Sequence, residues 1–153
     1  MLTYISLTEN ASIVKENTNR TNKINSLLLI DPTENTSILI DSNFPTKFID
    51  NFYQNLKNPV SALLLSHCHL DHSSRVYYHQ NRYRTHLLCP IQEEDYLLSL
   101  DSLLTRVGIK KLGLTKTFKI FTNEYIKYKK IDKIETYQPG QDSFNYPKIQ
   151  IQT

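Results

Sequence analysis

The stretch VSALLLSHCHLDH, at residues 60–72, decides the fold. It opens with a short apolar run, which is typical of a β-strand buried on both faces of a sheet. Three histidines and one aspartate then follow within six positions. In an extended segment every second side chain points the same way, so His67, His69 and Asp71 are expected to project together. His72 points elsewhere unless the chain turns there, and the pattern therefore predicts a polar site at the end of this strand.

These ligand types indicate a metal centre. The loop would present two pairs of ligands, His67 with His69 and Asp71 with His72, to two neighbouring points in space. Imidazole and carboxylate groups suit zinc, with iron or manganese as possible replacements. The position at a strand end, where α/β proteins place their sites, favours this interpretation over a chance cluster of structural histidines. Cys68 is expected to point to the opposite side and to pack as a small apolar residue.

Length and composition indicate one globular domain across residues 1–153. Apolar residues make up 39% of the chain and charged residues 22%, which excludes a disordered composition. Apolar runs are far shorter than the ~20 residues that cross a bilayer, and the first residues do not resemble a secretory signal. Two cysteines cannot build a disulfide framework, so an intracellular location without membrane partners is expected. The net charge of +3 is too mild to indicate nucleic acid by itself.

Hydrophobic periodicity predicts alternating strands and helices. Short β-rich runs before Asp41 are separated by polar stretches, whereas Phe48, Ile49 and Phe52 recur at helical spacing. Pro90, with Glu93 and Glu94 in the turn that follows it, is typical of a helix start. We predict three or four antiparallel strands within 2–40, a helix within 44–58, strands at 60–66 and 85–90, and helices within 74–83 and 90–108. His79 is expected on a helix surface and His86 in a strand, both outside the metal site.

HCHLDH resembles the HxHxDH signature of the metallo-β-lactamase superfamily, and the runs NSLLLID and TSILIDSN resemble the paired strands that precede it there. The resemblance implies an α/β fold, an αββα sandwich. It also implies that His67 and His69 bind one metal ion while Asp71 and His72 bind a second. Asp71 would in addition orient the attacking hydroxide, and Asp41 would take the supporting position behind the metal ligands.

The same resemblance implies further ligands downstream, beginning with a histidine in a Gly-His turn. After His72 the sequence has only His79 and His86, both too early and without that context. The final PKIQIQT resembles the strand that leads into the turn. We therefore expect the N-terminal half of the domain, truncated at its C-terminus, with one or two zinc ions bound by an incomplete ligand set.

Residues 121–141, FTNEYIKYKKIDKIETYQPGQ, resemble a stretch of the β-CASP nuclease branch of this superfamily. The start of the chain and the segment LIDSNFPTKFID resemble the endonuclease subunits of the mRNA cleavage and polyadenylation factor and their larger paralogues. This resemblance implies an RNA substrate cleaved at a phosphodiester, other subunits of a 3′-end processing complex as partners, and a nuclear location.

A basic stretch at residues 106–133 holds nine basic and two acidic residues, with aromatic residues between them. Such a stretch can follow a phosphate backbone and stack bases, although a solvated face over buried aromatics explains it too. The predicted RNA-binding residues are Lys110, Lys111, Lys116, Lys119, Lys127, Lys129 and Lys130. Two other functions stay open: an esterase or thioesterase acting on a small molecule, and a non-catalytic scaffold in a processing complex.

Overall fold

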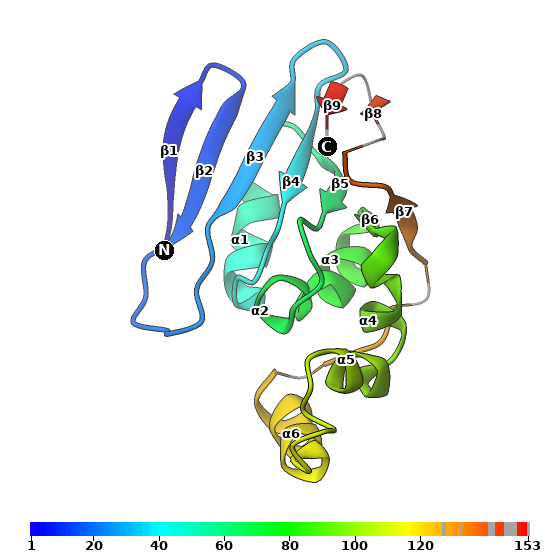
Figure 1. Cartoon of the computed structure of the whole chain (residues 1–153). Helices are drawn as coiled ribbons and strands as arrows, with labels where there is room; N and C mark the ends of the chain where they lie inside the picture. The colour runs from blue at the N-terminus through cyan, green and yellow to red at the C-terminus, as the bar shows by residue number, and fades with distance from the viewer. Residues whose placement is uncertain (127, 132, 141–142, 146–149, 153) are drawn as a thin grey trace.

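The computed structural model describes residues 1–126, 128–131, 133–140, 143–145 and 150–152. A seven-stranded mixed sheet with the strand order β1 to β7 forms its centre (Figure 1). The strands are β1 (Leu2–Thr8), β2 (Ala11–Glu16), β3 (Ser26–Asp31), β4 (Thr36–Ile40), β5 (Val60–Leu64), β6 (His86–Pro90) and β7 (Glu135–Tyr137). A separate pair, β8 (Ser143–Asn145) and β9 (Gln150–Gln152), is antiparallel.

The first four strands pair antiparallel, as predicted, and the strands from β4 to β7 pair parallel. The β3–β4 turn shows how polar residues replace glycine in this chain. The Asp31 carboxylate accepts hydrogen bonds from the backbone N–H groups of Thr33 and Glu34, at 2.8 and 3.1 Å. Asn35 completes the turn in the left-handed region, with φ 54°. The hairpin therefore forms without the glycine that such a turn usually contains.

Helices α1 (Thr46–Asn55) and α3 (Val76–Tyr83) confirm the helices predicted within 44–58 and 74–83. Each lies in a connection between two parallel strands, and both lie against one face of the sheet (Figure 1). Pro45 precedes α1, and the helix buries Ile49 and Phe52. The short α2 (Leu70–Ser73) lies at the C-terminal end of β5. Parallel pairing places the carboxyl ends of neighbouring strands at one edge, where loops can meet.

Strand β5 is buried on both faces, as its apolar run predicted. Leu63 belongs to the large core that also contains Phe52 of α1 and Val76 of α3. Ala62 and Leu64 alternate to the other face and pack in a second cluster with Ile38, Leu88 and Tyr137. Because side chains on both faces of β5 are packed, the register of the strand is fixed. The position at which the chain leaves the strand, at residue 65, is therefore fixed as well.

The single helix predicted within 90–108 is wrong. The chain forms a 3₁₀ turn (Ile91–Glu93), then α4 (Glu94–Leu98) and α5 (Leu100–Arg106), with Ser99 extended between the helices at φ −148° and ψ 122°. Ser99 begins α5 as its N-cap, because its hydroxyl accepts a hydrogen bond from the Ser102 N–H at 3.3 Å. Because the chain bends at Ser99, α4 buries Leu97 in the main core, whereas Leu103 and Leu104 of α5 are buried outside that cluster.

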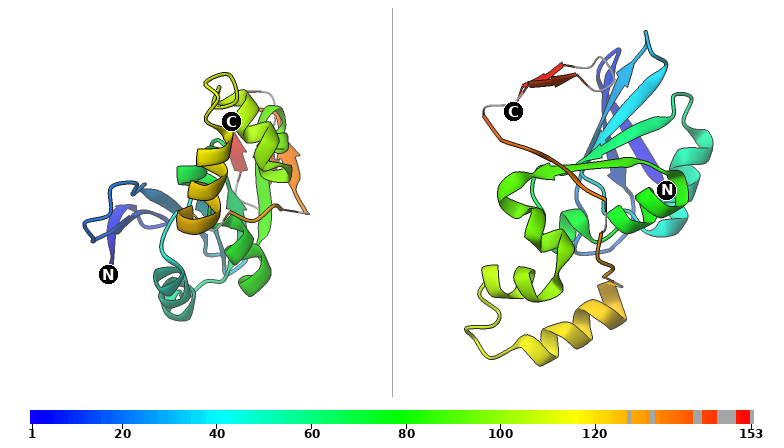
Figure 2. Two further views of the ribbon diagram at one scale, coloured as in Figure 1. Left: turned by 90° about the horizontal axis from the view of Figure 1, so that it is seen from below. Right: turned by 90° about the vertical axis from the view of Figure 1, so that its right-hand side faces the viewer.

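The segment after Gly108, for which periodicity made no clear prediction, forms α6 (Thr115–Phe121), continued by a π-helical turn (Thr122–Ile126). Figures 1 and 2 show α5 and α6 beyond the end of the sheet at which α2 lies. The chain then returns, and Ile131 is buried in the main core before β7 pairs with β6. No helix within the described part of the chain is long and apolar enough to cross a membrane.

Candidate metal centre

The candidate metal-binding loop, called the metal-binding loop below, is residues 65–72, which leave β5 and enter α2. His69 has an extended conformation, φ −62° and ψ 153°, and α2 begins at Leu70. The backbone N–H groups of His72 and Ser73 both donate to the carbonyl of His69, at 2.9 Å. Asp71 and His72 therefore lie in a helical turn, and the prediction that Asp71 continues an extended alternation is wrong. The turn brings the carboxylate back toward the histidines that precede it.

The turn gathers three ligand groups. One potential ligand atom from each of His67, His69 and Asp71 lies within 4.8 Å of the others. His72 lies beside them, because its Nε2 is 3.7 Å from Asp71 Oδ2 and its ring centre is 3.9 Å from that of His67. Burial, followed by the neighbouring rings of His72 and His69, lowers the pKa of His67. The cluster therefore favours neutral imidazole at His67, which is the form that binds a cation.

Asp41 joins the end of β4 to this loop. Its backbone is left-handed, with φ 55°, and its N–H donates to the carbonyl of Leu64 at 2.8 Å. One carboxylate oxygen accepts from the Ser66 N–H at 2.8 Å, and the other accepts from the Ser66 hydroxyl at 2.7 Å. The second oxygen also lies 3.1 Å from His72 Nδ1, at an angle that makes an electrostatic contact rather than a hydrogen bond. Nδ1 of His72 thus faces Asp41 and Nε2 faces the ligand cluster.

Ser66 extends the same contact to His67. The Ser66 hydroxyl, which donates to Asp41, lies 3.0 Å from His67 Nδ1. A hydroxyl whose proton is donated to a carboxylate can accept one from the imidazole, which assigns the proton of neutral His67 to Nδ1. The lone pair of Nε2 is then left for a metal ion. Contacts of this kind behind metal ligands fix the tautomer and the ring orientation.

Two residues of the segment after β6 also hold the loop, and neither was predicted as a site residue. The Glu93 carboxylate accepts a hydrogen bond from the Cys68 N–H at 2.6 Å, between the two ligand histidines. The Tyr96 ring stacks on His69, with ring centres 6.2 Å apart and planes at 6°. Acidic residues after Pro90 were taken for ordinary helix-start residues. No sequence signal links residue 93 to residue 68, because the contact depends on the parallel pairing of β5 with β6.

The two cysteines and the other two histidines are outside the ligand cluster. Cys68 is fully buried, as predicted, and a hydrogen bond to Cys89 together with burial raises the pKa of its thiol. His79 is not on a helix surface: it is 1% exposed, and its ring nitrogens contact the Tyr53 hydroxyl at 3.0 Å and the Ser42 hydroxyl at 2.9 Å. His86 lies in β6, as predicted, and its ring contacts Glu135 at 3.0 Å.

Of the predicted RNA-binding lysines, Lys110, Lys111, Lys116, Lys129 and Lys130 are exposed, whereas Lys127 lies outside the described residues. Lys119 forms an ion pair with Asp101, at 2.8 Å. Lys129 lines a cavity together with Ser74 and Arg75, which directly follow the metal-binding loop. The basic stretch therefore returns to the neighbourhood of the site at Lys129.

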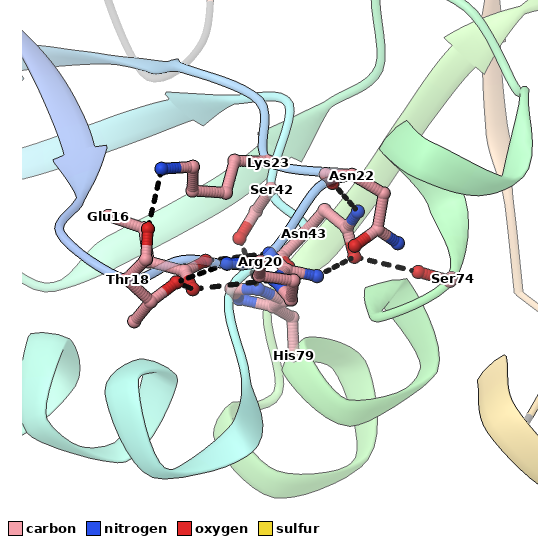
Figure 3. A network of polar contacts seen from close by, with 9 residues as sticks. All are labelled: Glu16, Thr18, Arg20, Asn22, Lys23, Ser42, Asn43, Ser74 and His79. Carbon is pink, nitrogen blue, oxygen red and sulfur yellow. Dashed lines mark hydrogen bonds and ion pairs between the residues drawn. The ribbon is translucent and has the colours of Figure 1, made fainter.

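A polar network fastens the β2–β3 connection to the site (Figure 3). Arg20 pairs with Glu16 at 2.6 Å and donates to the carbonyl of Asn43 at 2.5 Å. The Asn43 amide donates to the carbonyl of Asn22 at 3.0 Å, and its side-chain oxygen accepts from the Ser74 hydroxyl at 2.9 Å. These bonds hold residues 20–22 against the helical segment that carries Asp71.

Two hollows meet at Asp71. The first, which we call the arginine cavity, has a volume of about 510 Å³ and is lined by Arg20, Thr21, Asn22, Asn43, Leu70, Asp71, Ser74, Arg75, Phe118, Phe121 and Ile126. The second, which we call the apolar groove, has a volume of about 290 Å³ and is lined by His69, Leu70, Asp71, Leu103, Val107, Ile109 and Phe118. Leu70, Asp71 and Phe118 belong to both. A bound molecule can thus reach the ligand cluster from either side.

The donor set fits a divalent metal ion. Imidazole nitrogens and a carboxylate oxygen are ligands that zinc prefers, and three of them already lie within 4.8 Å of one another. His69 and Asp71 are exposed, so an ion can reach them. Behind these ligands, Ser66 contacts His67 through its hydroxyl and Asp41 faces His72, as the groups that support metal ligands do.

Fold and site together define an α/β protein with a metal-binding loop at the carboxyl end of a parallel strand. The sequence model of the metallo-beta-lactamase superfamily matches residues 20–142, and the chain belongs to this superfamily. The predicted superfamily and the α/β fold class are thereby confirmed. A comparison of the sequence with curated proteins found no match.

Solved metallo-beta-lactamases share the fold. The Rm3 metallo-beta-lactamase has a TM-score of 0.59 at 18% identity, over 93% of this chain and 47% of that one. DIM-1 metallo-beta-lactamase has a TM-score of 0.56 at 11% identity, over 89% of this chain and 51% of that one. FIM-1 from Pseudomonas aeruginosa, in its mono-zinc form, has a TM-score of 0.50 at 16% identity, over 61% and 44%. The chain spans about half the length of these structures, and identities this low establish the fold alone.

Proposed function

We propose that this chain contributes the first ligand group of a zinc-dependent hydrolase centre. The observation that supports it most is the convergence of His67, His69 and Asp71 within 4.8 Å at a strand end. Nε2 of His72 faces the same cluster because Asp41 faces its Nδ1. Zinc bound at such a centre lowers the pKa of water and polarises the bond to be cleaved.

The residues of the site have different proposed roles. His67, His69, Asp71 and His72 bind the cation, and Asp41 with Ser66 fixes the orientation of the rings. The Asp71 carboxylate, whose side chain is 51% exposed, lies where both hollows meet and can accept a hydrogen bond from an attacking water molecule. Arg75 and the polar wall of the arginine cavity face the position that a substrate would take.

Metal analysis of the purified chain tests this proposal. We expect at least one zinc ion per chain after dialysis, and loss of that zinc in the double variant His67→Ala with His69→Ala. His86→Ala is the matched control, because His86 pairs with Glu135 away from the cluster and should leave the zinc content unchanged. Equal zinc content in the double variant would show that His67 and His69 do not bind the zinc.

For the substrate, the proposal is a phosphodiester of RNA, cleaved within a 3′-end processing complex in the nucleus. Two basic residues near the site support it, the exposed Lys129 and the partly buried Arg75, which line the same cavity. Aromatic side chains of Phe118 and Phe121 line the arginine cavity and offer surfaces on which bases can stack. Association with other subunits of that complex belongs to the same proposal.

Salt-dependent binding of single-stranded RNA tests the substrate class. We expect Lys129→Glu to weaken binding and to reduce its salt dependence, because a phosphate contact is lost. Lys57→Glu is the control, since residue 57 precedes β5 and lies toward the opposite end of the parallel strands. Equal effects of the two charge reversals, or hydrolysis of a model thioester without RNA binding, would favour the small-molecule esterase instead.

A further inference from the structure

Arg75 is a partly buried cation that lacks an anionic partner within the described part of the chain. Its Nη1 donates to the carbonyl of Ile126 at 3.0 Å, and its buried Nε has no hydrogen-bond partner among the described residues. Burial, and after it the nearby Arg20, lowers the pKa of Arg75. A guanidinium removed from water without a carboxylate is unfavourable, so its position calls for a compensating group.

The Ile126 bond places the Arg75 guanidinium at the arginine cavity, because Ile126 lines this cavity as well. Arg20 lines the same wall, but its charge is already balanced by Glu16, which is 5% exposed. Asn43 and Ser74, bonded to each other at 2.9 Å, add fixed polar groups between them. The cavity thus combines one uncompensated cation with a rigid polar wall and has room for a small ligand.

We propose that the arginine cavity is an oxyanion-binding site in which the Arg75 guanidinium binds a phosphate group of the substrate beside Asp71. The proposal rests on the proposed hydrolase function and assigns a substrate-binding residue to it. Arginine presents a planar set of donors that matches two oxygens of a phosphate. Because the Nε–H is buried, the terminal guanidinium nitrogens at the cavity wall supply those donors.

The neighbouring apolar groove indicates an organic phosphate ester rather than free phosphate. The groove and the arginine cavity share Leu70, Asp71 and Phe118, so one molecule can place its phosphate against Arg75 and its apolar part between Leu103 and Val107. Asp71 carries a negative charge at the boundary and opposes an anion unless a cation is bound there. Tight binding of the phosphate therefore requires both Arg75 and a group that neutralises the charge of Asp71.

Binding of phenyl phosphate to the chelator-treated chain tests the site without any phosphate bound to metal. Calorimetry or chemical-shift titration should give a dissociation constant that rises at least about tenfold in Arg75→Gln, the loss of a charged hydrogen bond. Arg82→Gln removes an exposed arginine of the same helix and should bind as the wild type does. Asp71→Asn should bind more tightly, since one opposing charge is removed, and Arg75→Lys should recover part of the loss.

Three further outcomes bear on the assignment. Equal binding by Arg75→Gln and Arg82→Gln would overturn it, and circular dichroism of each variant shows that the fold is retained. Benzoate binding as tightly as phenyl phosphate would overturn the phosphate class, and inorganic phosphate binding as tightly would overturn the ester. Zinc content is measured separately. Normal zinc content together with phenyl phosphate binding that does not depend on Arg75 would reject the oxyanion site alone. Binding that depends on Arg75 in a chain that binds no zinc would reject the hydrolase centre alone.

Discussion

Asp41 combines a left-handed backbone, φ 55°, with contacts to both Ser66 and His72. Aspartate tolerates this conformation better than most residues, although it still carries some strain. Asp41→Asn keeps the size of the side chain but removes the charge that faces His72 Nδ1. We expect zinc affinity to fall by about 10- to 100-fold, the usual effect of changing a residue behind a metal ligand. Competition with a chromophoric chelator measures it.

Asp31→Asn is the matched control for this prediction. Asp31 is also buried at a strand end, and its carboxylate accepts hydrogen bonds from the N–H groups of Thr33 and Glu34 in the β3–β4 turn. Its substitution should lower the free energy of unfolding without changing zinc affinity. A similar loss of zinc affinity in both variants would attribute the Asp41 effect to general destabilisation.

His79 predicts a pH dependence of stability. Burial lowers its pKa to about 3, whereas an unfolded histidine has a pKa of about 6.5. The unfolded state therefore binds an extra proton between these values, so stability is fully present above pH ~6.5 and is lost as the pH falls. Between pH 7.5 and 5.0 we expect His79 to contribute a loss of about 2 kcal/mol in urea unfolding. His79→Gln should lack this component; an unchanged difference between the two pH values would contradict it.

Sequence reasoning found the candidate ligand cluster because its residues are close together along the chain and share one chemistry. His67, His69 and Asp71 need only a short turn to meet. The same reasoning placed His79 on a surface, because its hydrogen-bonding partners, Tyr53 and Ser42, come from segments far away in sequence. A buried polar residue cannot be told from an exposed one until its partners are known.

Among the secondary-structure elements, the segment 90–108 shows where apolar spacing does not predict the helix boundaries. Its apolar spacing suits one long helix, but Ser99 accepts a capping bond and divides it. Serine competes with the helix for backbone hydrogen bonds, which is why it favours a cap. The same segment begins with a 3₁₀ turn at Ile91–Glu93 instead of a regular helical turn. From this turn the Glu93 carboxylate reaches the Cys68 N–H. The metal-binding loop thus depends on an irregularity that periodicity conceals.

Glu93→Gln tests this dependence between elements. The charge-assisted bond to the Cys68 N–H, at 2.6 Å, would become a neutral one, and we expect a loss of about 1 to 2 kcal/mol in the free energy of unfolding. Zinc affinity should fall as well, because residues 67 and 69 flank the bond. Glu94→Gln alters the neighbouring acid, which has no such contact to the loop, and should change neither quantity. Identical unfolding curves and zinc affinities for the two variants would show that the bond does not hold the loop.

For the molecule as a whole, the succession of elements was predictable from residues 2 to 90: strand runs up to residue 40, then helices alternating with buried strands. Such a pattern leads to a mixed sheet with a small choice of topologies. The return of the chain after α6 was not predictable. Ile131 enters the core and Tyr137 donates to the carbonyl of Leu65 at 2.8 Å, contacts that depend on the position of β6 rather than on local pattern. The arginine cavity was missed for the same reason, since its walls come from four separate segments.

The metal-binding loop is attached to strands that are distant in sequence, so metal binding should stabilise the whole molecule. Leu65 is bonded to both Leu88 of β6 and Tyr137 of β7, and Ser66 is bonded to Asp41. Opening the loop therefore requires several strands to separate. Zinc at 100 times its dissociation constant should add about 2.7 kcal/mol to the free energy of unfolding. For a domain of this size, that corresponds to a rise in Tm of about 5 to 10 °C.

Calorimetry with and without zinc measures this rise. The double variant His67→Ala with His69→Ala should show no rise, whereas His86→Ala should show the full one, because only the former removes ligands from the cluster. A rise of equal size in the double variant would mean that zinc stabilises the fold elsewhere. A rise that is absent even in the wild type, despite measured binding, would mean that the unfolded chain binds zinc as tightly as the folded chain does. The hydrogen bonds of Leu65 and Ser66 hold the ligand histidines in an arrangement that the unfolded chain lacks, so we expect the folded chain to bind zinc more tightly.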